Sequence, residues 1–190
     1  KNTRRAVVSS CSYEARRFGV RSAMPIAQAA RLCPEGIFIP PNYRLYKDVS
    51  AKVHAVFRQL APVVEPLSID EAFLDMTSKA HLFPSLERMG HFTKERVYDA
   101  VGCTASAGIA PNKFLAKLAS DLRKPDGLAV VRPHEIDALL LPMPVQQLWG
   151  VGEKTAQRLG ALGVHTVADL REKSFAWLCR QLGKHGAVLY

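Results

Sequence analysis

Two adjacent acidic residues, Asp70 and Glu71, lie in a segment whose pattern suits metal-dependent chemistry. They fall within residues 68–75 (SIDEAFLD), between two short apolar runs that are typical of neighbouring antiparallel strands. Burying carboxylates at a rigid sheet edge is costly unless a cation or a partner compensates them. Mg²⁺ commonly takes one or two carboxylates together with substrate phosphates, which is the arrangement that two-metal phosphoryl transfer needs. A surface or salt-bridged acidic pair is the alternative interpretation.

A second candidate site lies in residues 12–22 (SYEARRFGVRS). Tyr13 and Arg16 are three positions apart, so on a helix they could share one face. A tyrosine hydroxyl and a planar arginine fork on one face could bind a triphosphate. The alternative is a solvated, charged helix face.

A third candidate is the glycine turn Gly150-Val151-Gly152, which is followed by apolar residues at helical spacing and by a second Gly-Val pair at Gly163. This pattern resembles a helix-hairpin-helix motif, in which backbone N–H groups at a helix N-terminus hold a DNA phosphate without reading sequence. An ordinary pair of antiparallel helices is the alternative.

The elements that must position these residues can be predicted from periodicity. Apolar spacings of three and four predict an amphipathic helix over residues 43–60. Apolar runs predict strands over residues 63–69, 72–77, 103–109 and 128–131, and helices are expected near residues 85–100 and over 112–122. Residues 124–127 (KPDG) predict a turn. Beyond residue 132 the pattern becomes wholly helical.

Composition favours a folded chain with a polyanionic partner. The chain has 190 residues and a formal net charge of +9, and residues 1–60 carry eleven Lys or Arg against three acids. Such a basic segment makes nucleic acid the first expectation. No apolar run approaches the roughly 20 residues of a membrane span, so we expect a cytoplasmic protein. The four cysteines show no CxxC spacing, which argues against a zinc site or a disulfide scaffold and predicts buried thiols.

Taken together and in this order, these segments resemble the DinB-type, or DNA polymerase IV, branch of the Y-family translesion DNA polymerases, the family also described as ImpB/MucB/SamB/UmuC. The resemblance runs over essentially the whole chain. It is carried by residues 12–20 (SYEARRFGV), 68–75 (SIDEAFLD) and 104–122 (TASAGIAPNKFLAKLASDL), together with the KPDG turn and the glycine hairpin.

The resemblance implies an α+β fold. It comprises a polymerase-type palm over residues 41–132, with a mixed, mainly antiparallel sheet and two helices, a partial fingers region over residues 1–40, and an all-α thumb with the helix-hairpin-helix motif over residues 133–190. The implied reaction is template-directed transfer of a nucleotidyl group from a dNTP to a primer 3′ end across damaged template, as part of DNA repair and the SOS response.

The family pattern also implies residue roles. Asp70 and Glu71 would be catalytic, metal-binding carboxylates for Mg²⁺, with two ions in the intact enzyme. Tyr13, Arg16 and Lys124 would contact the phosphates of the incoming dNTP. Gly150, Val151 and Gly152 would hold the backbone of the primer-template DNA.

Two features of the family pattern have no counterpart in this sequence. A first palm strand, with a further metal-binding aspartate, is expected before Lys1, and a little-finger domain is expected after Tyr190. We therefore expect the isolated chain to bind DNA weakly and to lack polymerase activity, and we expect an exposed palm edge that could favour dimerisation. A sliding clamp is a further expected partner of the full-length protein.

Two other interpretations remain open. A non-catalytic helix-hairpin-helix module that holds DNA for a partner explains the charge and the glycine turn, but not the co-occurrence of Tyr13, Arg16, Asp70, Glu71 and Lys124. Metal-dependent dNTP binding distinguishes the two. A nucleotidyl cyclase-like palm shares two-metal chemistry but fits the glycine hairpin and the basic N-terminal segment poorly.

Overall fold

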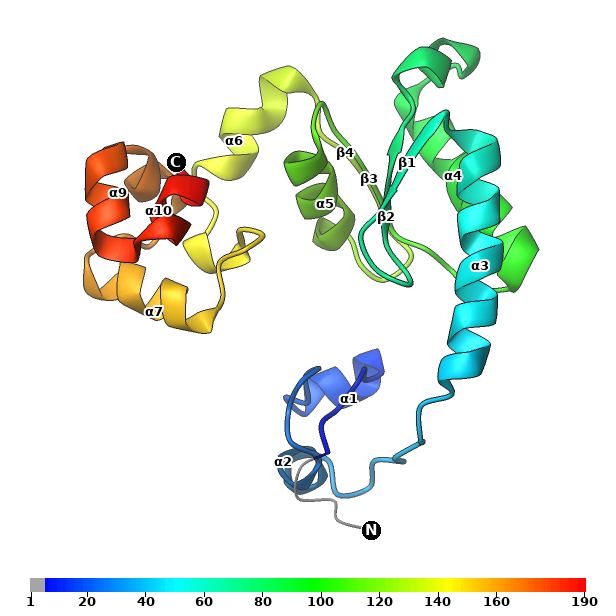
Figure 1. Cartoon of the computed structure of the whole chain (residues 1–190), viewed down its shortest axis with the longest axis horizontal. Coiled ribbons are helices and arrows are strands. Elements are labelled where there is room, and N and C mark those ends of the chain that lie inside the picture. The colour runs from blue at the N-terminus through cyan, green and yellow to red at the C-terminus, as the bar shows by residue number, and fades with distance from the viewer. Residues whose placement is uncertain (1–5) are drawn as a thin grey trace. The chain divides into compact units, whose positions relative to one another are not determined.

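The structure is a computed structural model that describes residues 6–190, and it divides the chain into two compact units (Figure 1). The first unit extends to Asp48 and the second runs from Val49 to Tyr190. The boundary falls within the helix α3 (Tyr43–Leu60), whose bounds match the predicted amphipathic segment. Each unit is described by itself below.

The first unit is a small helical body. It contains α1 (Tyr13–Arg17) and α2 (Ile26–Leu32), and an isolated antiparallel bridge joins Val7 to Pro25. Its core consists of small aliphatic side chains, namely Val8, Val20 and Ala29. The helix predicted to carry Tyr13 and Arg16 is therefore present, although it is only five residues long.

The second unit is built around two two-stranded sheets. The strand β1 (Val63–Pro66) pairs antiparallel with β2 (Ala72–Asp75), and β3 (Ala107–Ile109) pairs in parallel with β4 (Leu128–Val130). Within residues 6–190, no hydrogen-bond ladder joins β2 to β3, so the strands expected in one mixed sheet form two separate sheets. The third strand is also shorter than the predicted residues 103–109, because its ladder with β4 extends over only three residue pairs.

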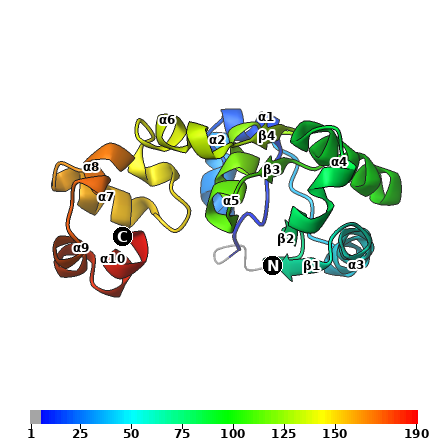
Figure 2. The ribbon, with the colours of Figure 1, turned by 90° about the horizontal axis from the view of Figure 1, so that it is seen from above.

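Helices cover these sheets. The helix α4 (Leu86–Val101) begins at the N-cap Ser85 and ends at Gly102, which adopts a left-handed conformation. Figures 1 and 2 show α4 on one side of β3 and β4 and α5 (Lys113–Leu122) on the other. The helices α3 and α4 share an apolar cluster with β2 that contains Val56, Leu60, Val97 and Leu74. The cluster anchors the β1–β2 hairpin on the helices, and the predicted helix–strand–strand–helix–strand order is confirmed.

The helix α5 lies unusually close to β3. The side chain of Asn112 accepts a hydrogen bond from the Leu115 N–H at 2.9 Å and fixes the start of the helix. A Cβ atom on Gly108 of β3 would lie 2.1 Å from the carbonyl oxygen of Ala116. Only glycine at residue 108 therefore allows the helix backbone to approach the strand this closely.

The chain beyond residue 132 is helical, as predicted. A buried cluster of Val145, Leu148, Val151, Leu159, Val164, Leu170 and Leu178 forms its core. The short helices that precede the glycine turn are η3 (Pro133–Glu135), α6 (Ile136–Leu140) and η4 (Val145–Gln147). The helices that follow it are α7 (Glu153–Ala161), α8 (Val167–Arg171), α9 (Phe175–Leu182) and α10 (Lys184–Leu189).

The cysteines and the hydropathy of the helices bear on two further expectations. All four cysteines are free thiols, but Cys103 is exposed and the other three are only half-buried, so the prediction of buried thiols is wrong. Among residues 6–190, no helix has both the length and the apolar character needed to span a bilayer.

Candidate active site

The adjacent acids Asp70 and Glu71 lie in the loop of the β1–β2 hairpin. Pro66 pairs with Ala72, so residues 67–71 form the loop. The N–H groups of Leu67 and Ser68 donate to the carbonyl oxygen of Glu71 at 2.9 and 3.1 Å. These two bonds close the loop and place both acids where the loop enters β2.

The two carboxylates have different surroundings. Asp70 is exposed, and its Oδ1 accepts a hydrogen bond of 2.7 Å from the Ser68 hydroxyl. Glu71 is half-buried, with 35% of its side chain exposed, and its Oε1 lies 2.8 Å from Nζ of Lys117. The expected burial of both acids is therefore not found, and each carboxylate is oriented by a neighbouring donor instead.

Lys117 belongs to α5 and also contacts Asp121, one turn further along the helix. Its Nζ lies 3.1 Å from Oδ2 of Asp121. Burial lowers the pKa of Lys117, but hydrogen bonds to Glu71 and Asp121 outweigh this effect, so that the pKa is raised overall. Lys117 is therefore a cation held between two carboxylates.

Lys124 joins the same group of ion pairs. Its Nζ lies 2.6 Å from Oδ1 of Asp121. Burial raises the pKa of Asp121, but hydrogen bonds from Lys124 and Lys117 outweigh it and lower the pKa overall. A continuous series of contacts thus runs from Glu71 through Lys117 and Asp121 to Lys124, which connects two of the predicted site residues.

Tyr13 and Arg16 lie together in the first unit. Cζ of Arg16 is 5.6 Å from the centroid of the Tyr13 ring, which places the two side chains on one face of α1, as predicted. The Ser12 side chain caps the helix by accepting a hydrogen bond of 3.2 Å from the Ala15 N–H. The other predicted site residues, Asp70, Glu71, Lys124 and the glycine turn, belong to the second unit.

The glycine turn leads directly into α7. Gly150 has a φ of +94°, a conformation that favours glycine, and the Val151 side chain is buried in the C-terminal core. Gly152 is the N-cap of α7 and provides no side-chain cap. Backbone N–H groups at the start of the helix are therefore available to an anion. The element before the turn is the short 3₁₀ helix η4 rather than a longer α-helix.

Trp149, which directly precedes the turn, contacts the hairpin that carries the acids. The ring centroids of Trp149 and Phe73 are 6.1 Å apart, and Nζ of Lys113 lies 5.9 Å from the centroid of the Phe73 ring. Lys113 also forms an ion pair of 2.9 Å with Glu65 on β1. The α5 lysines and Trp149 thus flank the β1–β2 hairpin.

Lys117 and Asp121 lie in the helix predicted over residues 112–122, but sequence reasoning gave them no role. The available signal was their spacing of four residues, which allows an ion pair on a helix. Periodicity alone could not show that Lys117 would also reach Glu71, 46 residues earlier in the chain.

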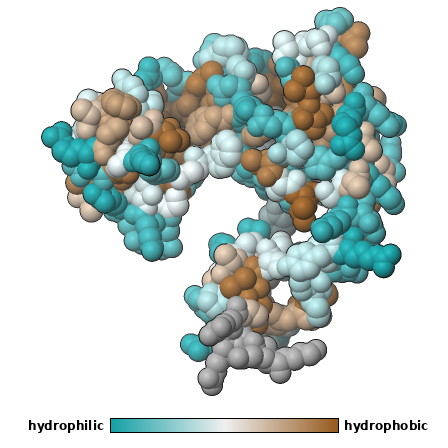
Figure 3. Space-filling model, viewed as in Figure 1, coloured by the Kyte–Doolittle hydropathy of each residue, from teal (hydrophilic) through white to brown (hydrophobic). Residues whose placement is uncertain are grey.

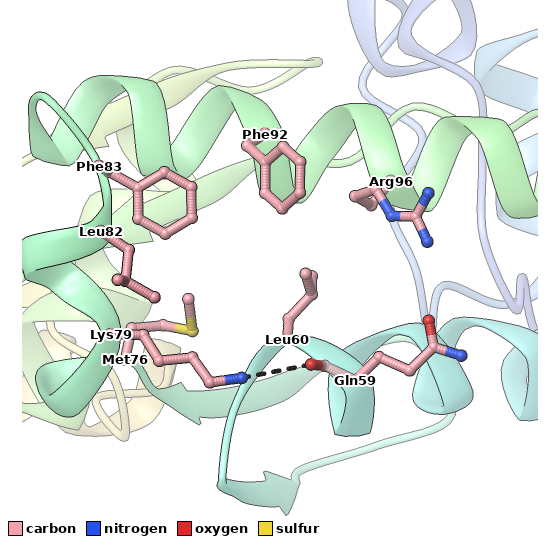
Figure 4. Close-up of a pocket in the computed structure, with 8 residues that line it drawn as sticks. All are labelled: Gln59, Leu60, Met76, Lys79, Leu82, Phe83, Phe92 and Arg96. Carbon is pink, nitrogen blue, oxygen red and sulfur yellow. Dashed lines mark hydrogen bonds between the residues drawn. The ribbon is translucent and has the colours of Figure 1, made fainter.

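An apolar hollow of about 380 Å³ opens elsewhere in the second unit, between α3, η2 (Thr77–Leu82) and α4. Figure 4 shows Phe83 and Phe92 facing it from one side, while Nζ of Lys79 donates to the carbonyl oxygen of Gln59 at 3.3 Å. None of the predicted site residues lines it. Figure 3 shows apolar side chains in separate patches on the visible face rather than in one broad band.

The side chains of the candidate site are of the type that binds a hard divalent cation. Asp70 and Glu71 offer only carboxylate oxygens, which are the ligands that Mg²⁺ prefers. In the part of the chain that the structure describes, no three or more His, Cys, Asp or Glu side chains gather as a metal cluster. Two carboxylates match the use of Mg²⁺ with substrate phosphates and water rather than a cage made of protein ligands alone.

Comparison with known proteins gives the class of this chain. The model of the impB/mucB/samB family matches residues 1–121, and the chain belongs to this family. It is 46% identical over 187 residues to the DNA polymerase IV of Pseudomonas aeruginosa strain UCBPP-PA14, covering 98% of this chain and 54% of that protein. It is 48% identical to the DNA polymerase IV of Listeria monocytogenes serotype 4a strain HCC23, covering 98% of this chain and 52% of that protein.

Solved structures agree with this class. DinB from Sulfolobus solfataricus superposes with a TM-score of 0.86 at 33% identity, over 96% of this chain and 54% of that chain. An insertion ternary complex of Dbh DNA polymerase gives the same TM-score and identity, over 96% of this chain and 53% of that chain. The Y-family polymerase fold is thereby confirmed, and the chain spans about half the length of the relatives that it matches.

Proposed function

We propose that this chain is the core of a translesion DNA polymerase of the DNA polymerase IV type, acting in DNA repair and the SOS response. The reaction is template-directed nucleotidyl transfer from a dNTP to a primer 3′ end. The observation that carries the proposal is the pair Asp70 and Glu71, positioned in a closed hairpin loop beside a lysine-bearing helix, in a member of the impB/mucB/samB family.

The proposed roles follow from the chemistry of the side chains. Mg²⁺, two ions in the intact enzyme, would supply charge stabilisation at the reacting phosphate. Asp70, exposed and oriented by Ser68, would hold a metal, and Glu71 would be the acid nearest the primer 3′ hydroxyl. Lys124 would contact the dNTP phosphates, as would Tyr13 and Arg16 on α1.

The proposed domains are the fingers over residues 1–40, the palm over residues 41–132 and the thumb over residues 133–190. In the thumb, the backbone of Gly150, Val151 and Gly152 would hold DNA phosphates, because α7 begins without a side-chain cap. Binding of this kind carries no base specificity, as a polymerase that moves along its template requires. Contact with a sliding clamp and dimerisation through a palm edge remain predictions.

Magnesium-dependent dNTP binding by this chain tests the proposal against a module that only holds DNA. We expect weak dATP binding that requires Mg²⁺ in isothermal titration and that Asp70→Ala abolishes. Asp75→Ala is the matched control, because Asp75 lies at the opposite end of the same hairpin, paired with Val63. DNA binding without any magnesium-dependent nucleotide binding would favour the non-catalytic module.

Primer extension tests the assignment of the carboxylates. In a polymerase of the relatives' full length that carries this segment, Asp70→Ala or Glu71→Ala should abolish extension and leave duplex binding within about twofold, because the carboxylates act on the transition state rather than on the duplex. Substantial extension by either variant would refute the metal site.

A further inference from the structure

Lys117 is the most enclosed member of the ion-pair series described above. Only 15% of its side chain is exposed, against 35% for Glu71 and 47% for Asp121. Its Nζ contacts Oε1 of Glu71 and Oδ2 of Asp121 at the same time. Fixing the Lys117 side chain costs conformational entropy once but gives two contacts. Each contact is therefore less costly than the single contact of an isolated, exposed ion pair.

The series joins two parts of the unit that no strand ladder connects. The helix α5 packs on β3, whereas Glu71 is the last residue of the loop of the β1–β2 hairpin. Lys117 therefore ties the acid-bearing loop to α5, and Lys113 ties β1 to the same helix one turn earlier through Glu65. The Lys113 side chain is 60% exposed, so its ion pair with Glu65 is more strongly screened by solvent.

The charges of the series alternate in sign. Two carboxylates, Glu71 and Asp121, are balanced by two ammonium groups, Lys117 and Lys124. Glu71 also follows directly after the carboxylate of Asp70. A fixed cation at Glu71 thus offsets the repulsion that two adjacent acids would otherwise experience.

We propose that Lys117 is a positioning residue that serves as the resident counter-ion of Glu71. It holds this carboxylate toward α5 until a divalent cation displaces Lys117 or binds the same carboxylate beside it. The inference rests on the proposed function, because it assumes that Asp70 and Glu71 receive the metal. Through Asp121, the same lysine links the acidic end of the site to Lys124 at the phosphate-binding end.

If Lys117 is a counter-ion, removing its charge should raise the affinity for a divalent cation; if its role is purely structural, removing it should not. Lys117→Met keeps an unbranched, flexible side chain that is one heavy atom shorter, and removes the charge. Because a competing cation is lost, Mn²⁺ should bind the chain about fivefold more tightly, as expected for one screened charge near the site. A lysine that only supported the fold would, when replaced, weaken Mn²⁺ binding or leave it unchanged.

The experiment measures Mn²⁺ affinity by electron paramagnetic resonance on the 190-residue chain. Lys117→Arg should restore the wild-type affinity because the positive charge is kept. Lys113→Met is the matched control, since it removes a lysine one turn earlier whose partner is Glu65, and it should leave Mn²⁺ affinity unchanged. Equal or weaker Mn²⁺ binding by Lys117→Met, with binding still dependent on Asp70, would overturn the counter-ion role.

A second measurement does not depend on the metal. A double-mutant cycle with Glu71→Gln and Lys117→Met in urea unfolding should show a coupling of at least about threefold in the unfolding equilibrium constant. Absence of coupling would show that the pair does not form and would overturn the inference. Failure of the proposed function looks different: neither the wild type nor Lys117→Met would bind Mn²⁺, or Asp70→Ala would leave the binding unchanged.

Discussion

Replacing Gly108 by alanine should separate α5 from β3 and destabilise the second unit. The added Cβ would lie 2.1 Å from the carbonyl oxygen of Ala116 and 2.4 Å from the backbone nitrogen of Ser120. Real Cβ atoms essentially never approach closer than 3.0 Å, so the helix would have to retreat by about 1 Å. The obstructing atoms belong to the helix backbone and cannot rotate away as a side chain could.

The magnitude follows from this geometry. Overpacking a core costs about 1–3 kcal/mol, and a clash with helix backbone belongs at the upper end of that range. A loss of about 3 kcal/mol changes the unfolding equilibrium constant roughly 150-fold. In a domain of this size it lowers the melting temperature by about 6–12 °C.

Thermal unfolding followed by circular dichroism measures this effect. Gly160→Ala is the control, because its Cβ would meet the His165 ring at an ordinary 3.7 Å and α7 would gain a better helix former. That variant should be as stable as the wild type or more stable, by up to about 1 kcal/mol. A Gly108→Ala protein that melts within about 2 °C of the wild type would show that α5 does not pack on β3 as described.

Two further predictions concern the C-terminal core and acid stability. Leu159 is fully buried, so Leu159→Ala should cost about 3 kcal/mol in urea unfolding, whereas truncation of Leu162, which is 39% exposed, should cost much less. The lowered pKa of Asp121, which its lysine partners cause against the effect of burial, gives a stabilisation that is present above the ordinary pKa of 3.8 and is lost as pH falls through the lowered value. As the pH falls through this range, the Asp121→Asn variant should therefore lose less free energy of unfolding than the wild type.

The sequence by itself determined the local elements and the family. The periodicity of residues 43–60 predicted α3 with its observed bounds, and the apolar spacing within residues 112–122 predicted α5, which begins one residue later at Lys113. The acidic pair between two apolar runs predicted the β1–β2 hairpin with Asp70 and Glu71 at its loop. These features depend on neighbouring residues in the chain, so a period of two or 3.6 residues is enough to reveal them.

Only the tertiary structure decided which distant residues meet. It placed Lys117 on Glu71, split the strands into two sheets, and left Asp70 exposed where sequence reasoning expected burial. Ion-pair partners and sheet neighbours are selected by packing between segments tens of residues apart, and no local period encodes that choice. The close approach at Gly108 has the same origin, because it depends on a helix that begins five residues after Gly108 in the sequence and folds back over the strand.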